Sequence, residues 1–169
     1  MSLTVTVYVN EGIVMASDSR TTYVKTSKSG PQQIGVHINN STQKTFLCPN
    51  QAGISTCGDA AVQRKPITGF IEAFIREKIK ESTDVEDMPG MILDYFDGLG
   101  PRNKTNFTIA GYRNHEGKKE QKVYKIKLLD GSVEEMETQN PGAAWDGETM
   151  VLIKLLQPVC LKGREGRCV

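Results

Sequence analysis

A β-hairpin pattern near the start of the chain is the strongest constraint that the sequence places on the fold. Residues 3–9 alternate between two faces, one with Val5, Val7 and Val9 and the other with Thr4, Thr6 and Tyr8. A period of two is typical of a half-buried strand. Asn10-Glu11-Gly12 then predicts a turn, and a second apolar strand runs to Asp18. Ser2 is therefore expected at the tip of ordered structure.

Two helices are predicted in the middle of the chain. The first carries an apolar stripe with spacings of three and four, formed by Ile67, Phe70, Ile71, Phe74, Ile75 and Ile79. Thr83 and Glu86 match a capping box in front of a second helix over residues 85–99. Consecutive helices with a tight joint predict an antiparallel pair.

Short strands are predicted on both sides of this helix pair. They are expected at residues 44–48, 53–57 (leading into a helix start), 106–113, 123–129 and 133–138, the last two joined by a two-residue turn at Asp130-Gly131. Residues 21–43 predict a long loop or an extended hairpin, and residues 143–157 a strand end, a turn and a helix stopped by Pro158. Without βαβ alternation, this order predicts one α+β domain over 1–169, with mainly antiparallel sheets.

Composition excludes several function classes. The net charge is +1 and basic residues are mixed with acidic ones, so we expect neither a nucleic-acid nor a membrane partner. No apolar run approaches the roughly 18 to 20 residues that span a bilayer, which predicts a cytoplasmic protein. In that compartment the four cysteines, without a CxxC pair, are expected to be reduced.

The common catalytic arrangements are missing. His37 and His115 are the only histidines and both lie in polar surroundings, which argues against a Ser-His-Asp or Cys-His site. The sequence has no HExxH pattern and no phosphate-binding glycine loop, so we expect no metal and no cofactor. The candidates that remain are Ser2, the Asp18-Ser19-Arg20 stretch, Lys44 and Gly58.

These candidates resemble the pattern of a known family. GIVMASDSR (residues 12–20), the isolated Lys44, STCGDAA (55–61) and, more faintly, FTIAGY (107–112) and AAWDGETMVL (143–152) are similar to bacterial-type proteasome β subunits, which are N-terminal-nucleophile (Ntn) hydrolases. The resemblance covers residues 2–156 and is strongest over 2–61. It implies a four-layer αββα sandwich, or one with an incomplete helical layer.

The resemblance implies a role for each matching residue. In that family the nucleophile is the first residue of the mature chain, and the aspartate of the A-x-D-x-R motif follows sixteen positions later, so counting back from Asp18 reaches Ser2. Once Met1 is removed, the free amine of Ser2 would act as general base for its own hydroxyl. Lys44 would favour deprotonation, Asp18 would hold Lys44, and the Gly58 N–H would stabilise the oxyanion.

Further matching positions concern the substrate and the support of the nucleophile. Arg20, Thr22 and Ala60 match substrate-binding positions, the last two by backbone pairing with an extended substrate. Asp146 stands where the family commonly has a serine. An acid there would hydrogen-bond the N-terminal ammonium, raise its pKa and weaken it as a base.

The expected function is hydrolysis of peptide or other amide bonds through an acyl-enzyme on Ser2. The resemblance implies a homo-oligomer, including a ring, while an ATPase partner stays unknown. One alternative is a non-catalytic subunit of the same fold, and another is an unrelated binding domain. Two further alternatives stay open: Met-Ser-Leu is vector-derived, or residues 157–169, which do not match the family, reflect a trimmed or truncated C-terminus.

Overall fold

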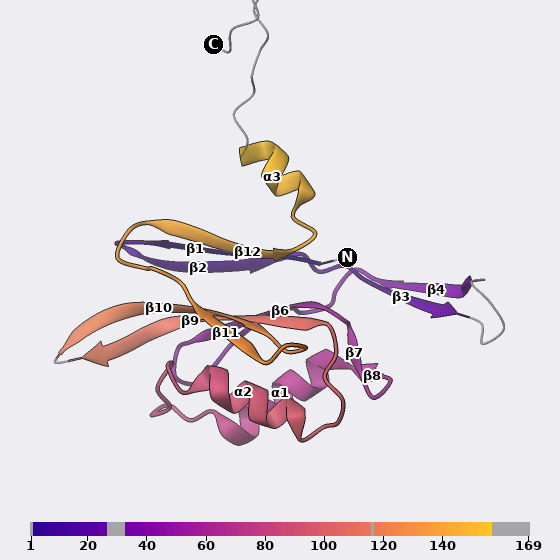
Figure 1. Cartoon of the computed structure of the whole chain (residues 1–169), viewed down its shortest axis with the longest axis horizontal. Helices are drawn as coiled ribbons and strands as arrows, with labels where there is room; N and C mark the ends of the chain where they lie inside the picture. Colours follow the sequence, from indigo (N-terminus) through magenta and orange to yellow (C-terminus); the bar gives the residue numbers. More distant parts are fainter. Residues whose placement is uncertain (1, 27–32, 116, 157–169) are drawn as a thin grey trace, which may run out of the picture.

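Two antiparallel sheets face each other in the middle of the computed structural model, which describes residues 2–26, 33–115 and 117–156 (Figure 1). The first sheet consists of three strands in the order β12 (Gly142–Gly147), β1 (Leu3–Val9), β2 (Gly12–Ser17). The second consists of five, in the order β11 (Ser132–Glu135), β10 (Lys118–Lys127), β9 (Thr105–His115), β6 (Gly53–Gly58), β5 (Thr45–Leu47). The prediction of mainly antiparallel sheets is confirmed.

Two hairpins lie outside these sheets. β3 (Thr21–Thr26) pairs with β4 (Gln33–Asn39), and this hairpin projects from the body of the molecule beside the N-terminus (Figure 1). The extended hairpin is thus the correct one of the two predictions for this stretch. The much shorter β7 (Ala61–Val62) and β8 (Lys65–Pro66) form the other hairpin.

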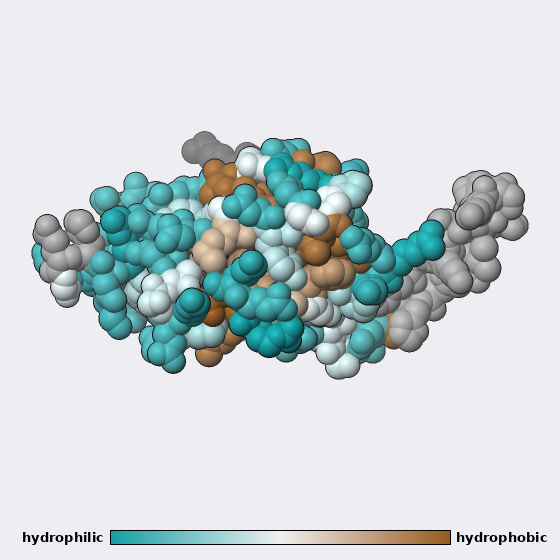
Figure 2. All heavy atoms as spheres, turned by 90° about the horizontal axis from the view of Figure 1, so that it is seen from below, coloured by the Kyte–Doolittle hydropathy of each residue, from teal (hydrophilic) through white to brown (hydrophobic). Residues whose placement is uncertain are grey.

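Helices α1 (Ile67–Lys78) and α2 (Met88–Asp97) cover the outer face of the five-stranded sheet (Figure 1). Their apolar stripes bury Phe74, Ile71 and Ile92 against Ile54 and Ile109 of the sheet, so the main core lies between helices and sheet. Figure 2 shows this helical side, where hydrophobic side chains form separate patches among hydrophilic ones.

Helix α3 (Met150–Leu156) follows β12 and lies beyond the three-stranded sheet (Figure 1). The described residues therefore establish an α+β architecture with one full helical layer and two sheets. Among them, α3 alone lies on the outer side of the three-stranded sheet, so the four-layer sandwich stays a prediction. Pro158 lies outside the described residues, as does the rest of the expected tail over 157–169.

The first strand buries the face that carries its threonines and Tyr8. The face that carries its valines, which are more hydrophobic, lies on the outside. Thr4, Thr6 and Tyr8 are at most 5% exposed, whereas Val7 and Val9 are about 40% exposed on the outer face of the three-stranded sheet. A buried hydroxyl is tolerated only where hydrogen bonds replace those it had with water. The space between the sheets is therefore polar where β1 begins.

Hydroxyl groups near that end of the sheets bond to one another. Thr45 Oγ1 donates to Ser17 Oγ at 2.9 Å and lies 3.1 Å from Ser55 Oγ, which links β2, β5 and β6. Towards the other end of β1, apolar side chains occupy the space between the sheets, and Tyr8 and Val123 pack there in a small second cluster.

Three local predictions are wrong. The helix start expected after β6 is delayed by the β7–β8 hairpin, whose turn holds Gln63 and Arg64 at positive φ. The capping box does not form, because Thr83 Oγ1 accepts the N–H of Lys80 instead. The β10–β11 connection contains four residues, 128–131, rather than a two-residue turn.

Candidate active site

Ser2 is held from one side by the end of β12. β1 is the central strand of its sheet, and the Glu148 N–H donates to the Ser2 carbonyl at 2.7 Å. Gly147 between them has φ +93°, and a Cβ on it would lie 1.9 Å from the Ser2 oxygen. Only glycine allows both this backbone conformation and this approach.

Asp18 holds the chain next to Ser2 from the other side. Its Oδ1 accepts the Leu3 N–H at 2.8 Å, and its own N–H donates to the Leu3 carbonyl at 3.1 Å. Its Oδ2 accepts the Arg20 N–H at 3.0 Å. The β2 end thus fixes the residue that follows the candidate nucleophile.

Lys44 completes this cluster from the five-stranded sheet. Its Nζ lies 2.9 Å from both carboxylate oxygens of Asp18 and also donates to the Arg20 carbonyl. The Lys44 side chain is 5% exposed and that of Asp18 is 35% exposed, so the ammonium is buried against a partly hydrated carboxylate. The structure thus brings together Ser2, Asp18 and Lys44, which lie far apart in the sequence.

The ion pair changes the acidity of Asp18. Burial by itself would raise the pKa of this carboxyl, but hydrogen bonds from Lys44 and from the Leu3 and Arg20 amides, with the Lys44 charge, lower it below its ordinary value of 3.8. Asp18 is therefore ionised at neutral pH and can keep Lys44 in place.

Acid is expected to weaken the fold through Asp18. Because its pKa is lower in the folded state, its stabilisation is complete above the ordinary value and is lost as pH falls through the folded value. We expect the difference in free energy of unfolding between the native protein and Asp18→Asn to be largest above about pH 5 and to shrink below about pH 4. Urea unfolding at several pH values from about 6 down to about 2 measures it, and a difference that stays constant over this whole range would contradict the assignment.

Gly58 ends β6 in a conformation that requires glycine. Its φ is +102°, and a Cβ there would lie 2.1 Å from the Lys104 carbonyl oxygen. Asp59 fixes this turn, because its N–H donates to that carbonyl and its Oδ2 accepts the Lys104 N–H at 2.9 Å. The backbone beside the site is thus rigidly placed.

A small cavity joins the candidate residues. It measures about 20 Å³ and is lined by Ser2, Lys44, Gly58 and Ala60, together with Thr21, Thr42, Gln43, Thr56, Cys57, Asp59, Ile67 and Thr68. Arg20 contributes its backbone to Lys44 but does not line this cavity, and Thr22 is exposed on β3 beside it. Thr21, Thr42, Gln43 and Thr68 are lining residues that no sequence pattern singled out.

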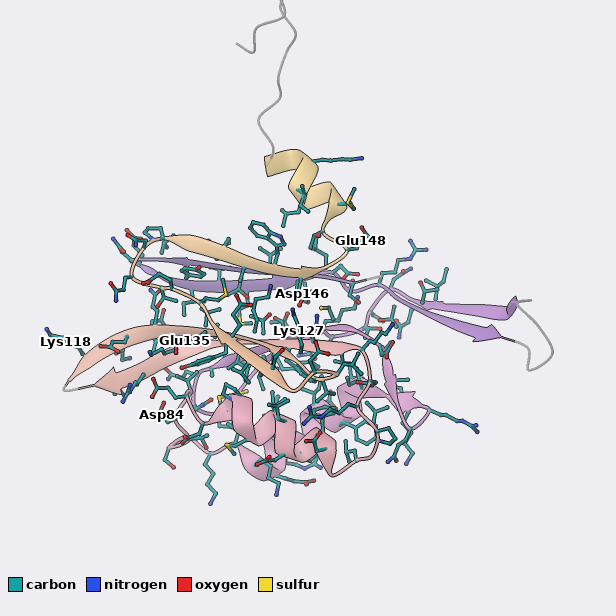
Figure 3. The ribbon with its side chains drawn as sticks, in the orientation of Figure 1. Asp84, Lys118, Lys127, Glu135, Asp146 and Glu148 are labelled. Carbon is teal, nitrogen blue, oxygen red and sulfur yellow. The ribbon has the colours of Figure 1, made fainter. Side chains whose placement is uncertain are left out.

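Asp146 precedes the Gly147-Glu148 backbone that holds Ser2, which we call the Ser2 clamp. Its Oδ2 accepts the Asn106 side-chain N–H at 2.9 Å, and its Oδ1 accepts the Gly147 N–H at 2.7 Å. Figure 3 shows Asp146 between the two sheets and Glu148 on the α3 side of the three-stranded sheet. In this arrangement the Asp146 hydrogen bonds support the backbone that clamps Ser2.

Cys57 is the other nucleophilic side chain at the cavity. Burial, followed by the nearby Asp146 charge, raises the pKa of its thiol to about 12. The thiol is therefore protonated at neutral pH, and a protonated thiol is a poor nucleophile. Cys57 and the equally buried Cys48 are both free cysteines.

A larger cleft lies away from these residues. It measures about 670 Å³ at the far end of the sheets and is lined by Asn10 and by residues 119–122 and 135–139, which are polar or charged except for Met136. We place the candidate site at the smaller cavity, because the buried ion pair and the clamped Ser2 are there.

No helix of the described residues has the length and apolar character needed to cross a membrane. Within that same part of the chain, no three His, Cys, Asp or Glu side chains are grouped so that they could hold a metal ion.

Comparisons with known proteins bear on the fold. No protein-family model matches the chain, and no curated protein matches its sequence. Among solved structures the chain is similar to Anbu from Hyphomicrobium sp. strain MC1, with a TM-score of 0.58 and 17% identity. The match covers 92% of this chain and 66% of that one, so this chain spans just under two thirds of the structure it matches.

Proposed function

We propose that the chain is a proteasome-like Ntn hydrolase that cleaves peptide or other amide bonds through an acyl-enzyme on Ser2. The observation that carries this proposal is the Asp18 carboxylate, which binds the buried Lys44 ammonium and the amide next to Ser2 at the same time. The fold is similar to that of Anbu, a proteasome-like protein, which supports the same class.

The first half of the reaction forms the acyl-enzyme. With Met1 removed, the neutral amine of Ser2, whose ordinary pKa is about 7.7 to 8.0, takes the hydroxyl proton while Oγ attacks the substrate carbonyl. The Gly58 N–H at the cavity would stabilise the oxyanion. The C–N bond then breaks, and the ammonium of Ser2 returns the proton to the leaving amine.

The second half releases the product. The freed amine of Ser2 takes a proton from water, and the resulting hydroxide attacks the ester carbonyl. The C–Oγ bond breaks, Oγ regains its proton, and a carboxylic acid leaves. The buried Lys44 charge favours the deprotonated form of Oγ in both halves, because a nearby cation lowers the free energy of an anion.

Intact mass measured with and without a β-lactone tests this function. We expect a chain that lacks Met1 and gains one inhibitor, with the adduct mapped by fragmentation to Ser2. Cys57→Ala is the matched control, since a thiol with a pKa of about 12 should not carry the label. Retained Met1 without an adduct would contradict the proposal and favour a non-catalytic subunit of the same fold.

A further inference from the structure

The Ser2 clamp lies at the end of an edge strand. Among the strands that the structure describes, β12 pairs with β1 alone, whereas β1 itself has a partner on both sides. The end of an edge strand opens more easily than that of a central one, because fewer contacts hold it. The position of the Ser2 carbonyl, which accepts the Glu148 N–H, therefore depends on what else fixes the end of β12.

One chain of hydrogen bonds joins this end of β12 to the five-stranded sheet. Asn106 on β9 donates a side-chain N–H to Asp146 Oδ2 at 2.9 Å. Asp146 Oδ1 accepts the Gly147 N–H at 2.7 Å, and the next amide, that of Glu148, donates to the Ser2 carbonyl. Figure 3 shows Asp146 between the two sheets. Asn106 is thus linked to Ser2 through three consecutive residues of β12 and its end.

The Asp146 carboxylate has other groups nearby with which it could pair. Burial raises the pKa of the Cys57 thiol and the Asp146 charge raises it further, whereas the Lys125 charge acts on the same thiol in the opposite direction. The thiol and the ammonium therefore both lie close to the carboxylate. Without the Asn106 donor, Asp146 Oδ2 would be left unpaired, and the carboxylate would turn towards one of these groups and away from the Gly147 N–H.

We propose, on the basis of the function above, that Asn106 is a positioning residue for the reaction of Ser2. Its amide holds the Asp146 carboxylate in the orientation that fixes the Gly147-Glu148 backbone, and this backbone fixes the place of Ser2 Oγ. Asn106 does not line the cavity at Ser2, so it acts through Asp146. A displacement of about 1 Å from a change far from the chemistry can cost about 10²-fold in rate, which is why this bond can control the reaction.

Asn106→Leu tests this role, because it keeps the size of the side chain and removes the donor. We expect the rate constant for labelling of Ser2 at saturating β-lactone to fall about 10²-fold. The half-saturating lactone concentration should change by less than about threefold, since Asn106 does not line the cavity. Intact mass at a series of times measures both quantities, under conditions in which urea unfolding shows the variant to be folded. A fall in the rate constant of less than about tenfold would overturn the proposal.

Gln121→Leu is the matched control. The Gln121 side chain also joins the two sheets, because its N–H donates to the Val9 carbonyl at 2.6 Å, but it does so at the opposite end of β1 from Ser2. Both variants lose one hydrogen bond between the sheets, and labelling should stay at the native rate in Gln121→Leu. An equal loss of labelling in the two variants would trace the effect to a weaker fold and would overturn the proposal.

Exchanging the two side chains tests the hydrogen bond itself. Asn106→Asp places a second carboxylate against Asp146, and because like charges repel, labelling at about pH 8 should fall at least as far as in Asn106→Leu. Adding Asp146→Asn restores a donor opposite an acceptor, and the oxygen of the new amide can still accept the Gly147 N–H. We expect the double variant to label at least about tenfold faster than Asn106→Asp alone. A folded double variant that does not recover would contradict the proposed role.

Labelling of the native protein separates this inference from the proposed function. If the β-lactone labels Ser2 at the same rate in the native protein and in Asn106→Leu, the positioning role is wrong and the function stands. If the β-lactone does not label Ser2 in the native protein, the proposed function is wrong, and the positioning role is wrong with it.

Discussion

Ser2→Ala is expected to abolish amide hydrolysis and β-lactone labelling while leaving the fold intact. Removing a catalytic nucleophile lowers kcat by about 10⁶ in a well-studied hydrolase, and we expect a loss of at least about 10⁵ here. The Ser2 hydrogen bond in the clamp uses its backbone carbonyl, so alanine keeps it. The free energy of unfolding should change by less than about 0.5 kcal/mol. Steady-state kinetics and urea unfolding measure the two quantities.

Ser2→Thr is the matched control for that experiment. It keeps a hydroxyl on the same carbon, and threonine is small enough to allow removal of Met1, so activity should persist at a reduced level. Full activity in Ser2→Ala would show that another group attacks the substrate, and the Ser2 assignment would be withdrawn.

Lys44→Met is expected to remove activity and to destabilise the protein. Removing one partner of a buried ion pair costs about 3 to 5 kcal/mol. We expect the lower end, about 3 kcal/mol, because Asp18 is 35% exposed and its carboxylate can take water in place of Lys44. Activity should fall at least about 10³-fold at a temperature where the variant is folded, because the charge that favours the Ser2 alkoxide is gone.

Two further variants separate the charge from the packing. In Asp18→Asn combined with Lys44→Met no unpaired charge remains, so part of the lost stability should return while activity stays absent. Lys122→Met removes a largely buried lysine that pairs with Glu86 and Glu135 beside the distant cleft. The Lys122→Met variant should have a lower free energy of unfolding than the native protein and the same hydrolytic activity. Recovery of activity in the double variant would show that Lys44 acts only on folding.

The first hairpin and the two helices could be predicted because their information is local. The β1–β2 turn and the apolar stripe of α1 each involve residues within one element or its neighbour. Which face of β1 is buried could not be read in this way. Thr4 and Thr6 are buried between two sheets that include strands from distant parts of the chain, and a period of two shows that the faces alternate but not which of them is buried.

The candidate site could also be predicted from the sequence only in part. The spacing between Ser2 and Asp18, together with the family resemblance, predicted residues that the structure places together around Lys44. The roles assigned to these residues, the homo-oligomer and the cytoplasmic location stay predictions. Thr21 and Thr68 could not be anticipated, because they reach the cavity only through the fold, Thr21 from the start of β3 and Thr68 from the first turn of α1. Their pattern in the sequence is that of ordinary strand and helix residues.

The central position of β1 has a consequence for how the protein is made. Pairing with β2 closes a short loop, whereas pairing with β12 brings Thr4 against Asp146 and closes a loop of most of the chain. Such distant pairings form late and slow folding. While the chain is being synthesised, Ser2 has no clamp until Gly147 and Glu148 have left the ribosome. In a nascent chain Ser2 is therefore made long before Gly147 and Glu148, the residues that hold it in place.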